Sequence, residues 1–160
     1  MLISKELTAA INEEIGLELF ACHQYLAIAA YFDSLALKKL AAMFYKQADE
    51  EQQHALKFIH YVSETGGALK IPQVKAPQAA FKSVEQAVKL SLDWEIEVTN
   101  RCNALMTIAV EQKDYIGQDF LRWFVTEQRE EVSTMENLLR VVRQAGERNI
   151  IMLEAYLSHE

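Results

Sequence analysis

Glu51 and His54 are three positions apart in a stretch with helical character. Residues i and i+3 of a helix point the same way, so this carboxylate and imidazole can share one metal ion. Such a pair often arises by chance. Three more carboxylates, Glu18, Glu95 and Glu131, each interrupt an apolar stripe near the middle of another long segment. Four acids and one histidine at one level can hold two metal ions.

The stripes themselves indicate that these acids are buried. Apolar residues recur in steps of three and four along all four segments, which is the spacing of one helix face. One such glutamate is explained by a tilted, partly solvated helix, but four together are not. Burial of an ionised carboxylate costs on the order of several kcal/mol without a counter-charge, and no Lys or Arg lies on a stripe. A carboxylate-rich set with one imidazole suits Fe(II), or Mn(II) as a mimic.

The segments that must position these residues are predicted to be helices. Glycine is scarce, and both prolines fall in one stretch, at Pro72 and Pro77. Ser4 and Asp114 are good N-caps, Ser83 with Gln86 forms a capping box, and glycines follow the second and fourth segments. The predicted helices run from after Ser4 to about Phe32, from Lys38 to Thr65, from Ser83 to Gln112, from Asp114 to Ala145, and from Asn149 to Ser158.

The stretch from Gly67 to Lys82 is long for a loop in a compact domain. Fully extended it spans about 50 Å, while a helix of about 28 residues is roughly 42 Å long. It can therefore return along the whole bundle. This predicts an all-α, ferritin-like four-helix bundle in which the second and third helices run parallel.

The length, composition and net charge of the chain limit its domain number and its classes of partner. The 160 residues are 51% hydrophobic and carry a net charge of −7, which predicts one domain over residues 1–160, with the bundle in 4–145 and a fifth helix in 147–158. We expect no nucleic-acid or membrane partner, because basic runs are absent and no apolar run approaches the roughly 20 residues of a span. With no signal peptide, the predicted location is cytoplasmic. Cys22 and Cys102 are expected to be reduced and buried.

The chain resembles the bacterial non-haem ferritins along essentially its whole length. The resemblance rests on Glu18 with Tyr25-Leu26, on QADEEQQHA at 47–55, on Glu95 with Val98-Thr99, and on FLRWFVTEQREE at 120–131. It implies an iron-storage protein with ferroxidase activity, which oxidises Fe(II) to Fe(III) with O2 or hydrogen peroxide and stores the product as mineral.

The resemblance also implies roles for individual residues. A first iron site would use Glu18, Glu51 and His54. A second would use Glu51, Glu95 and Glu131, with Glu51 bridging. Gln128 would be a hydrogen-bonding neighbour, and an outer third iron site would use Glu50, Glu127 and Glu130, although these three acids also fit an ordinary solvated surface.

Several residues outside the predicted ligand set are interpreted separately. For Tyr25 and Trp123, core packing and a role as electron donor beside the metals remain open. The histidines outside the site, His23, His60 and His159, are expected to be surface or structural residues.

Departures from related families are informative. The fourth helix carries Glu127 and Glu130 where bacterioferritins have a second Glu-x-x-His, and Gln52 stands near the place of their haem-binding methionine, so no haem is expected. The apolar fifth segment is too hydrophobic to be left in water. By resemblance it would help a homo-oligomer, of 24 subunits, close into a hollow shell.

Three alternatives stay open. A di-iron oxidase acting on an organic substrate would use the same ligands but would need a pocket beside the metals. A peroxidase of the same superfamily is disfavoured only by the missing cysteine site. A metal-free helical interaction protein would take up no metal.

Overall fold

The computed structural model describes residues 1–158. It confirms the all-α prediction and places the helices close to their predicted bounds. In chain order these elements are α1 (Lys5–Ser34), α2 (Lys38–Glu64), α3 (Val84–Glu111), α4 (Tyr115–Ala145), the 3-10 turn η1 (Glu147–Asn149) and α5 (Ile150–Leu157).

Three predicted N-caps hold the starts of long helices. The Ser4 hydroxyl accepts a hydrogen bond from the Leu7 amide, and the Asp114 carboxylate accepts one from Gly117. Ser83 likewise caps α3, with 3.0 Å between its hydroxyl and the Gln86 amide nitrogen. Each such cap is worth about 1 kcal/mol. The capping box differs in one respect, because the Gln86 side chain accepts from the amide of Lys82 rather than from Ser83.

The first helix extends two residues beyond its predicted end at Phe32. Asp33 does not break it, because its carboxylate is held by the Lys38 ammonium at 2.8 Å and the Tyr45 hydroxyl at 3.0 Å. The chain turns instead at Ala36, whose φ is 60°. A positive φ is uncommon outside glycine, so the sequence offered no signal for this turn.

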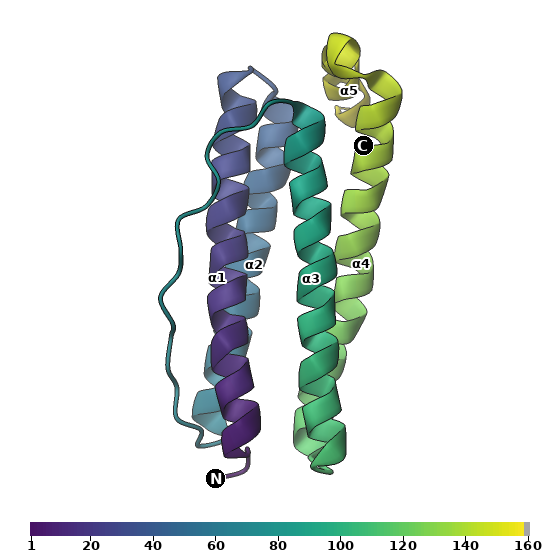
Figure 1. Cartoon of the computed structure of the whole chain (residues 1–160). Coiled ribbons are helices and arrows are strands. Elements are labelled where there is room, and N and C mark those ends of the chain that lie inside the picture. Colours follow the sequence, from purple (N-terminus) through teal and green to yellow (C-terminus); the bar gives the residue numbers. More distant parts are fainter. Residues whose placement is uncertain (159–160) are drawn as a thin grey trace.

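The four long helices form two antiparallel hairpins, α1 with α2 and α3 with α4 (Figure 1). The stretch between α2 and α3 runs back alongside α1, so α2 and α3 are parallel, as predicted (Figure 1). Gln24 fastens this stretch through two 2.9 Å hydrogen bonds with the backbone of Gln78. Gly16 allows its close approach, because a Cβ there would lie 2.4 Å from Cγ of Pro72.

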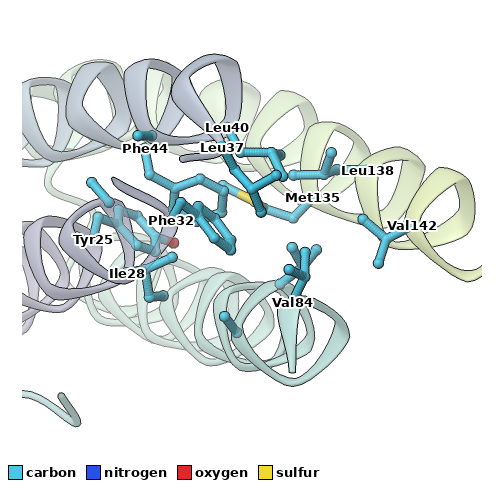
Figure 2. Packing of buried hydrophobic residues seen from close by; sticks show 14 of the residues in the cluster. Tyr25, Ile28, Phe32, Leu37, Leu40, Phe44, Val84, Met135, Leu138 and Val142 are labelled. Carbon is cyan, nitrogen blue, oxygen red and sulfur yellow. The ribbon is translucent and has the colours of Figure 1, made fainter. Parts of the chain in front are cut away.

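The buried interior consists of two apolar clusters. One, shown in Figure 2, is formed mainly by Tyr25, Phe32, Phe44 and neighbours from all four long helices and α5. The other occupies the opposite end of the bundle and includes Leu7, Phe58 and Phe124. Buried polar side chains lie at the level between them: Glu18, Gln47, Glu51, His54, Ser91, Glu95, Gln128 and Glu131.

Two expectations about apolarity and cysteines need correction. By length and composition, α1 is apolar enough to cross a membrane, although no such run was expected. Half of its most apolar window is buried, and it packs along α2, as in a core helix of a bundle. Both cysteines are free; Cys102 is buried as predicted, but Cys22 is only half-buried.

Candidate metal centre

Helix periodicity brings side chains from α1 and α2 together in the polar layer. Glu18 comes from α1, and Glu51 and His54 come from successive turns of α2. Each offers one ligand atom, and these atoms all lie within 4.8 Å of one another. All three residues are buried, so this group has the composition and spacing of a metal site closed to bulk water.

A second group joins α2 to the other hairpin. Glu51, Glu95 of α3 and Glu131 of α4 also offer ligand atoms within 4.8 Å of one another. Glu51 belongs to both groups, so its two carboxylate oxygens can serve neighbouring metal ions. The four long helices thus converge on one pair of potential sites.

Hydrogen bonds orient Glu95. The Tyr25 hydroxyl donates to Oε1 of Glu95, and Nε2 of Gln128 lies 3.1 Å from its Oε2. The same amide also faces Thr99 Oγ1, at 3.3 Å. Tyr25 is fully buried and contacts a carboxylate of the site, so it combines core packing with a position beside the metals. Such partners fix the direction of a ligand and tune its basicity.

Several candidate ligand atoms have no hydrogen-bond partner among the described residues. They are both carboxylate oxygens of Glu18, Oε1 of Glu51 and Nδ1 of His54. Nδ1 lies 3.5 Å from Oε2 of Glu51 and 3.6 Å from Oε2 of Glu18, so these contacts are electrostatic rather than hydrogen bonds. Buried polar atoms are rarely left unpaired. Metal ions would satisfy them.

Burial governs the protonation of the site. It raises the pKa of Glu18 and of Glu51 well above 4.5, and neighbouring carboxylates add to the effect. Burial and the charge of Glu95 raise the pKa of Glu131 to about 8. For His54, burial disfavours the imidazolium, but the nearby Glu51 carboxylate outweighs it and raises the pKa. An empty site therefore retains carboxyl protons near neutral pH, and metal binding must displace them.

The three predicted outer acids line one pocket between α2 and α4. This pocket has a volume of about 280 Å³, and Glu50, Glu127 and Glu130 share it with Glu131. Glu50 also faces the Lys46 ammonium at 3.7 Å. Glu127 is not wholly an outer residue, because it offers a ligand atom within 4.8 Å of atoms of His54 and Glu131. The pocket connects the surface to the buried groups.

Three residues outside the ligand set are exposed. Trp123 is 40% exposed, so the interpretation of its ring as core packing is wrong. Its ring lies edge-on to His54, with centroids 5.5 Å apart, and the Lys57 ammonium lies 4.1 Å from its centroid. His23 and His60 are exposed, as expected, and His159 lies outside the described residues.

Sequence reasoning did not select Glu14. Its side chain is only 2% exposed, one helical turn from Glu18. The burial of Glu14 could have been predicted from its spacing. It lies three residues after Ile11 and four before Glu18, which places it on the buried face of the helix. Adjacent Glu13 is exposed, and the pair of acids hides this difference in the sequence.

A four-helix bundle with a mid-level cluster of four carboxylates and one histidine defines the ferritin-like class of carboxylate-rich metal proteins. Comparison with known proteins agrees. The ferritin-like domain family matches residues 8–145. The chain belongs to the ferritin family.

Individual relatives cover nearly the whole chain. Ferritin BfrB of Mycobacterium tuberculosis is 38% identical over 152 residues, which are 95% of this chain and 83% of that protein. Bacterial non-heme ferritin of Staphylococcus aureus is 38% identical over 146 residues, 91% of this chain and 88% of the relative. A novel open pore ferritin from Archaeoglobus fulgidus superposes with a TM-score of 0.94 at 34% identity, covering 99% of this chain and 98% of the other. The protein is accordingly an iron-storage protein, and its family assigns it the oxidation of iron.

Proposed function

We propose that this chain oxidises Fe(II) to Fe(III) at two adjacent iron sites within one subunit. Glu18, Glu51 and His54 would bind the first iron, and Glu51, Glu95 and Glu131 the second. The observation that carries this proposal is the pair of ligand groups sharing Glu51, with unpartnered buried oxygen and nitrogen atoms. Iron is the substrate here, and it supplies the positive charge that the carboxylates lack.

The arrangement accounts for the chemistry of oxidation. Two Fe(II) ions give up two electrons, which reduce one O2 to hydrogen peroxide or one hydrogen peroxide to two waters. A site that holds both ions side by side delivers the electrons together, and the hard carboxylate oxygens stabilise the Fe(III) product. Tyr25, hydrogen-bonded to Glu95, is the proposed nearby source of a further electron.

The pocket beside the site favours iron over an organic substrate. Substrate pockets are predominantly apolar, but four glutamates, Glu50, Glu127, Glu130 and Glu131, line this one. Such a lining attracts cations rather than organic molecules. We therefore prefer iron oxidation and storage to an organic oxidase, and haem has no part in the proposal.

The test is aerobic addition of Fe(II) to the purified apo protein. We expect a rapid phase equal to two irons per subunit, followed by mineral growth, with iron retained in a large particle on size exclusion. To identify the oxidant, Fe(II) is bound under anaerobic conditions, and O2 or hydrogen peroxide is then added in separate experiments. Turnover of an organic substrate without iron retention would contradict the proposal.

Glu50, Glu127 and Glu130 are proposed to bind a third iron outside the two inner sites. Replacing all three with Ala should leave the rapid oxidation of the first two irons within about twofold of the parent, because the inner ligands remain. The number of irons oxidised per O2 and the later phases should change. Rapid-mixing absorbance with oxygen consumption measures both. Loss of the initial phase would show that one of the three acids is an inner ligand. Restoring only Glu127 in the triple variant would then test whether it is that ligand.

We propose that subunits assemble into a closed shell of 24, in the cytoplasm. In α5, Ile151 and Met152 are 77% and 69% exposed, while Leu153 is buried against the bundle. Exposed apolar side chains on a short terminal helix favour contact with another subunit. One relative in the same fold is described as an open pore ferritin, and storage of mineral requires a space that the bundle interior does not provide.

Truncation after Gly146 tests the role of this segment. The bundle should stay folded, while the shell dissociates more readily and retains less iron. Truncation also removes two hydrogen bonds at helix starts, which should lower the stability of the bundle. The Glu154 carboxylate accepts from the Lys39 amide at the start of α2, and the Glu147 carboxylate accepts from the Glu85 amide at the start of α3. A full-length variant with Glu147→Ala and Glu154→Ala, which removes both acceptors, is the matched control for the lost caps, worth about 1 kcal/mol each. A truncated chain with full-size particles and a full iron load would contradict this role.

A further inference from the structure

Glu14 is a buried carboxylic acid that the proposed iron ligands do not include. It lies on α1 one turn before Glu18, and its side chain is 2% exposed. Among the described residues its side chain has one hydrogen bond, in which Sγ–H of Cys102 on α3 donates to Oε1 at 4.0 Å. A buried acid with so weak a partner is costly, which calls for a reason other than packing.

A small cleft connects Glu14 to the surface. It lies between α1 and α3, has a volume of about 60 Å³, and is lined by Glu13 and Glu14 of α1, Arg101 of α3 and apolar residues of both helices. This is room for a few water molecules. The acidic pocket with Glu50 and Glu127 lies between α2 and α4, so the metal site faces two different seams of the bundle.

The charges around the cleft distinguish protons from metal cations. Arg101 lines it and pairs with Glu97 at 3.1 Å, while most of its other lining is Ala, Leu and Ile. A hydrated Fe(II) ion would meet two carboxylates and one guanidinium in this cleft of about 60 Å³. The α2–α4 pocket, of about 280 Å³, offers it four carboxylates beside one Lys46 ammonium, and is both wider and more negative. A proton needs only groups that accept and donate in turn.

The proposed reaction produces protons that must leave the layer between the apolar clusters. Iron displaces protons from the carboxyl groups of the site. The complete conversion of Fe(II) and O2 to FeOOH and hydrogen peroxide releases two protons per iron. Glu14 and Glu18 are four residues apart on α1, and residues i and i+4 of a helix have Cβ atoms about 5–6 Å apart. Both carboxylate oxygens of Glu18 lack a hydrogen-bond partner among the described residues, so they are free to pass a proton on.

We propose that Glu14 is a proton relay, which accepts protons from the iron site beside Glu18 and passes them to solvent through the cleft between α1 and α3. Iron would enter by the α2–α4 pocket, so substrate and protons would use different seams. The inference rests on the proposed function, since it assigns a residue to that reaction.

The electrostatic surroundings of Glu14 suit this role. Burial raises its pKa to about 8, Arg101 lowers it, and Glu97 raises it again. Of the other groups near it, Glu18 on α1 is buried, and Cys102 on α3 stays a neutral thiol because burial raises its pKa. Glu14 is therefore protonated near neutral pH in the empty protein, and iron in the site favours release of that proton. A group that titrates near the working pH transfers protons in both directions.

The experiment compares Glu14→Gln with Glu64→Gln, the same change at an exposed glutamate of α2 outside the cleft. Fe(II) oxidation and proton release are followed together in a stopped-flow instrument, by absorbance and a pH indicator. We expect Glu14→Gln to slow both by about tenfold or more, to enlarge the solvent deuterium isotope effect and to change the pH profile of the oxidation rate. Equilibrium iron binding should be unchanged, and Glu64→Gln should match the parent.

Ala10→Leu provides a second variant, because it fills the cleft while leaving Glu14 in place. It should slow proton release as Glu14→Gln does. Parent-like kinetics in Glu14→Gln or in Ala10→Leu would overturn the relay. Slower oxidation with an unchanged pH profile and isotope effect would also overturn it, because that result indicates a structural role. Slower iron uptake in Glu14→Gln would overturn the proton relay and indicate instead that iron enters through the cleft between α1 and α3. If the parent itself fails to oxidise Fe(II), the proposed function fails, which is a distinct result.

Discussion

Glu51→Gln is expected to abolish rapid Fe(II) oxidation while leaving the metal-free protein as stable as the parent, or more stable. The proposed bridging ligand loses the charge that both irons require, so the initial oxidation rate should fall by roughly 100-fold or more. The side-chain shape is retained. In the metal-free protein the substitution removes a buried carboxyl group that lies against Glu18 and Glu95.

The new amide should find partners within the polar layer. Oε1 of Gln47, one turn earlier on α2, is buried and has no hydrogen-bond partner, so it can accept from the introduced side-chain NH2 group. Rapid-mixing absorbance gives the oxidation rate, and calorimetry of the metal-free protein gives the unfolding temperature. Glu50→Gln, on the neighbouring and less buried position, is the matched control for both. A clear fall in metal-free stability would mean that Glu51 is a structural partner and that the metal site lies elsewhere.

The unfolding temperature of the metal-free protein is expected to fall as the pH rises from about 5.5 to about 8. Carboxyl groups titrate near 4.5 in the unfolded chain, whereas burial raises the pKa of Glu131 and of Glu14 to about 8 in the folded protein. Between these values the folded state binds more protons than the unfolded state, so stability decreases with increasing pH.

The effect should be large. A group that stays protonated only in the folded state contributes about 1.4 kcal/mol per pH unit, or about 3 kcal/mol over this range. Since 1 kcal/mol changes the unfolding temperature of a domain of this size by about 2–4 °C, a decrease of roughly 10 °C per group is expected. Mn(II) at saturation should reverse the slope, because ionised carboxylates bind it more tightly at higher pH. Glu131→Gln should flatten the metal-free slope. A metal-free protein that is more stable at pH 8 than at pH 5.5 would contradict burial as the main cause of these shifts.

The helices and the composition of the site could be predicted because both depend on short-range patterns. Steps of three and four residues indicate a helix face, and Glu18, Glu51, Glu95 and Glu131 stand where an apolar residue is expected, so their burial follows from the period alone. Ser4, Ser83 and Asp114 act as caps through contacts with amides three residues away, which is again local chemistry. The length of the stretch between α2 and α3 was enough to predict their parallel course.

The burial of individual charged side chains and the long-range helix caps depend on how the helices rotate and pack against one another. No local sequence pattern predicts this packing. Glu13 and Glu14 are adjacent and identical, yet only Glu14 is buried, because α3 covers one side of α1. Trp123 lies three residues after Phe120, at helical spacing, but it is exposed, with the Lys57 ammonium of α2 over its ring. Glu147 and Glu154 cap helices more than 60 residues away in the chain. Burial of a charged side chain and pairing across such distances are decided by packing, because their free energies come from neighbours that only the folded chain brings together.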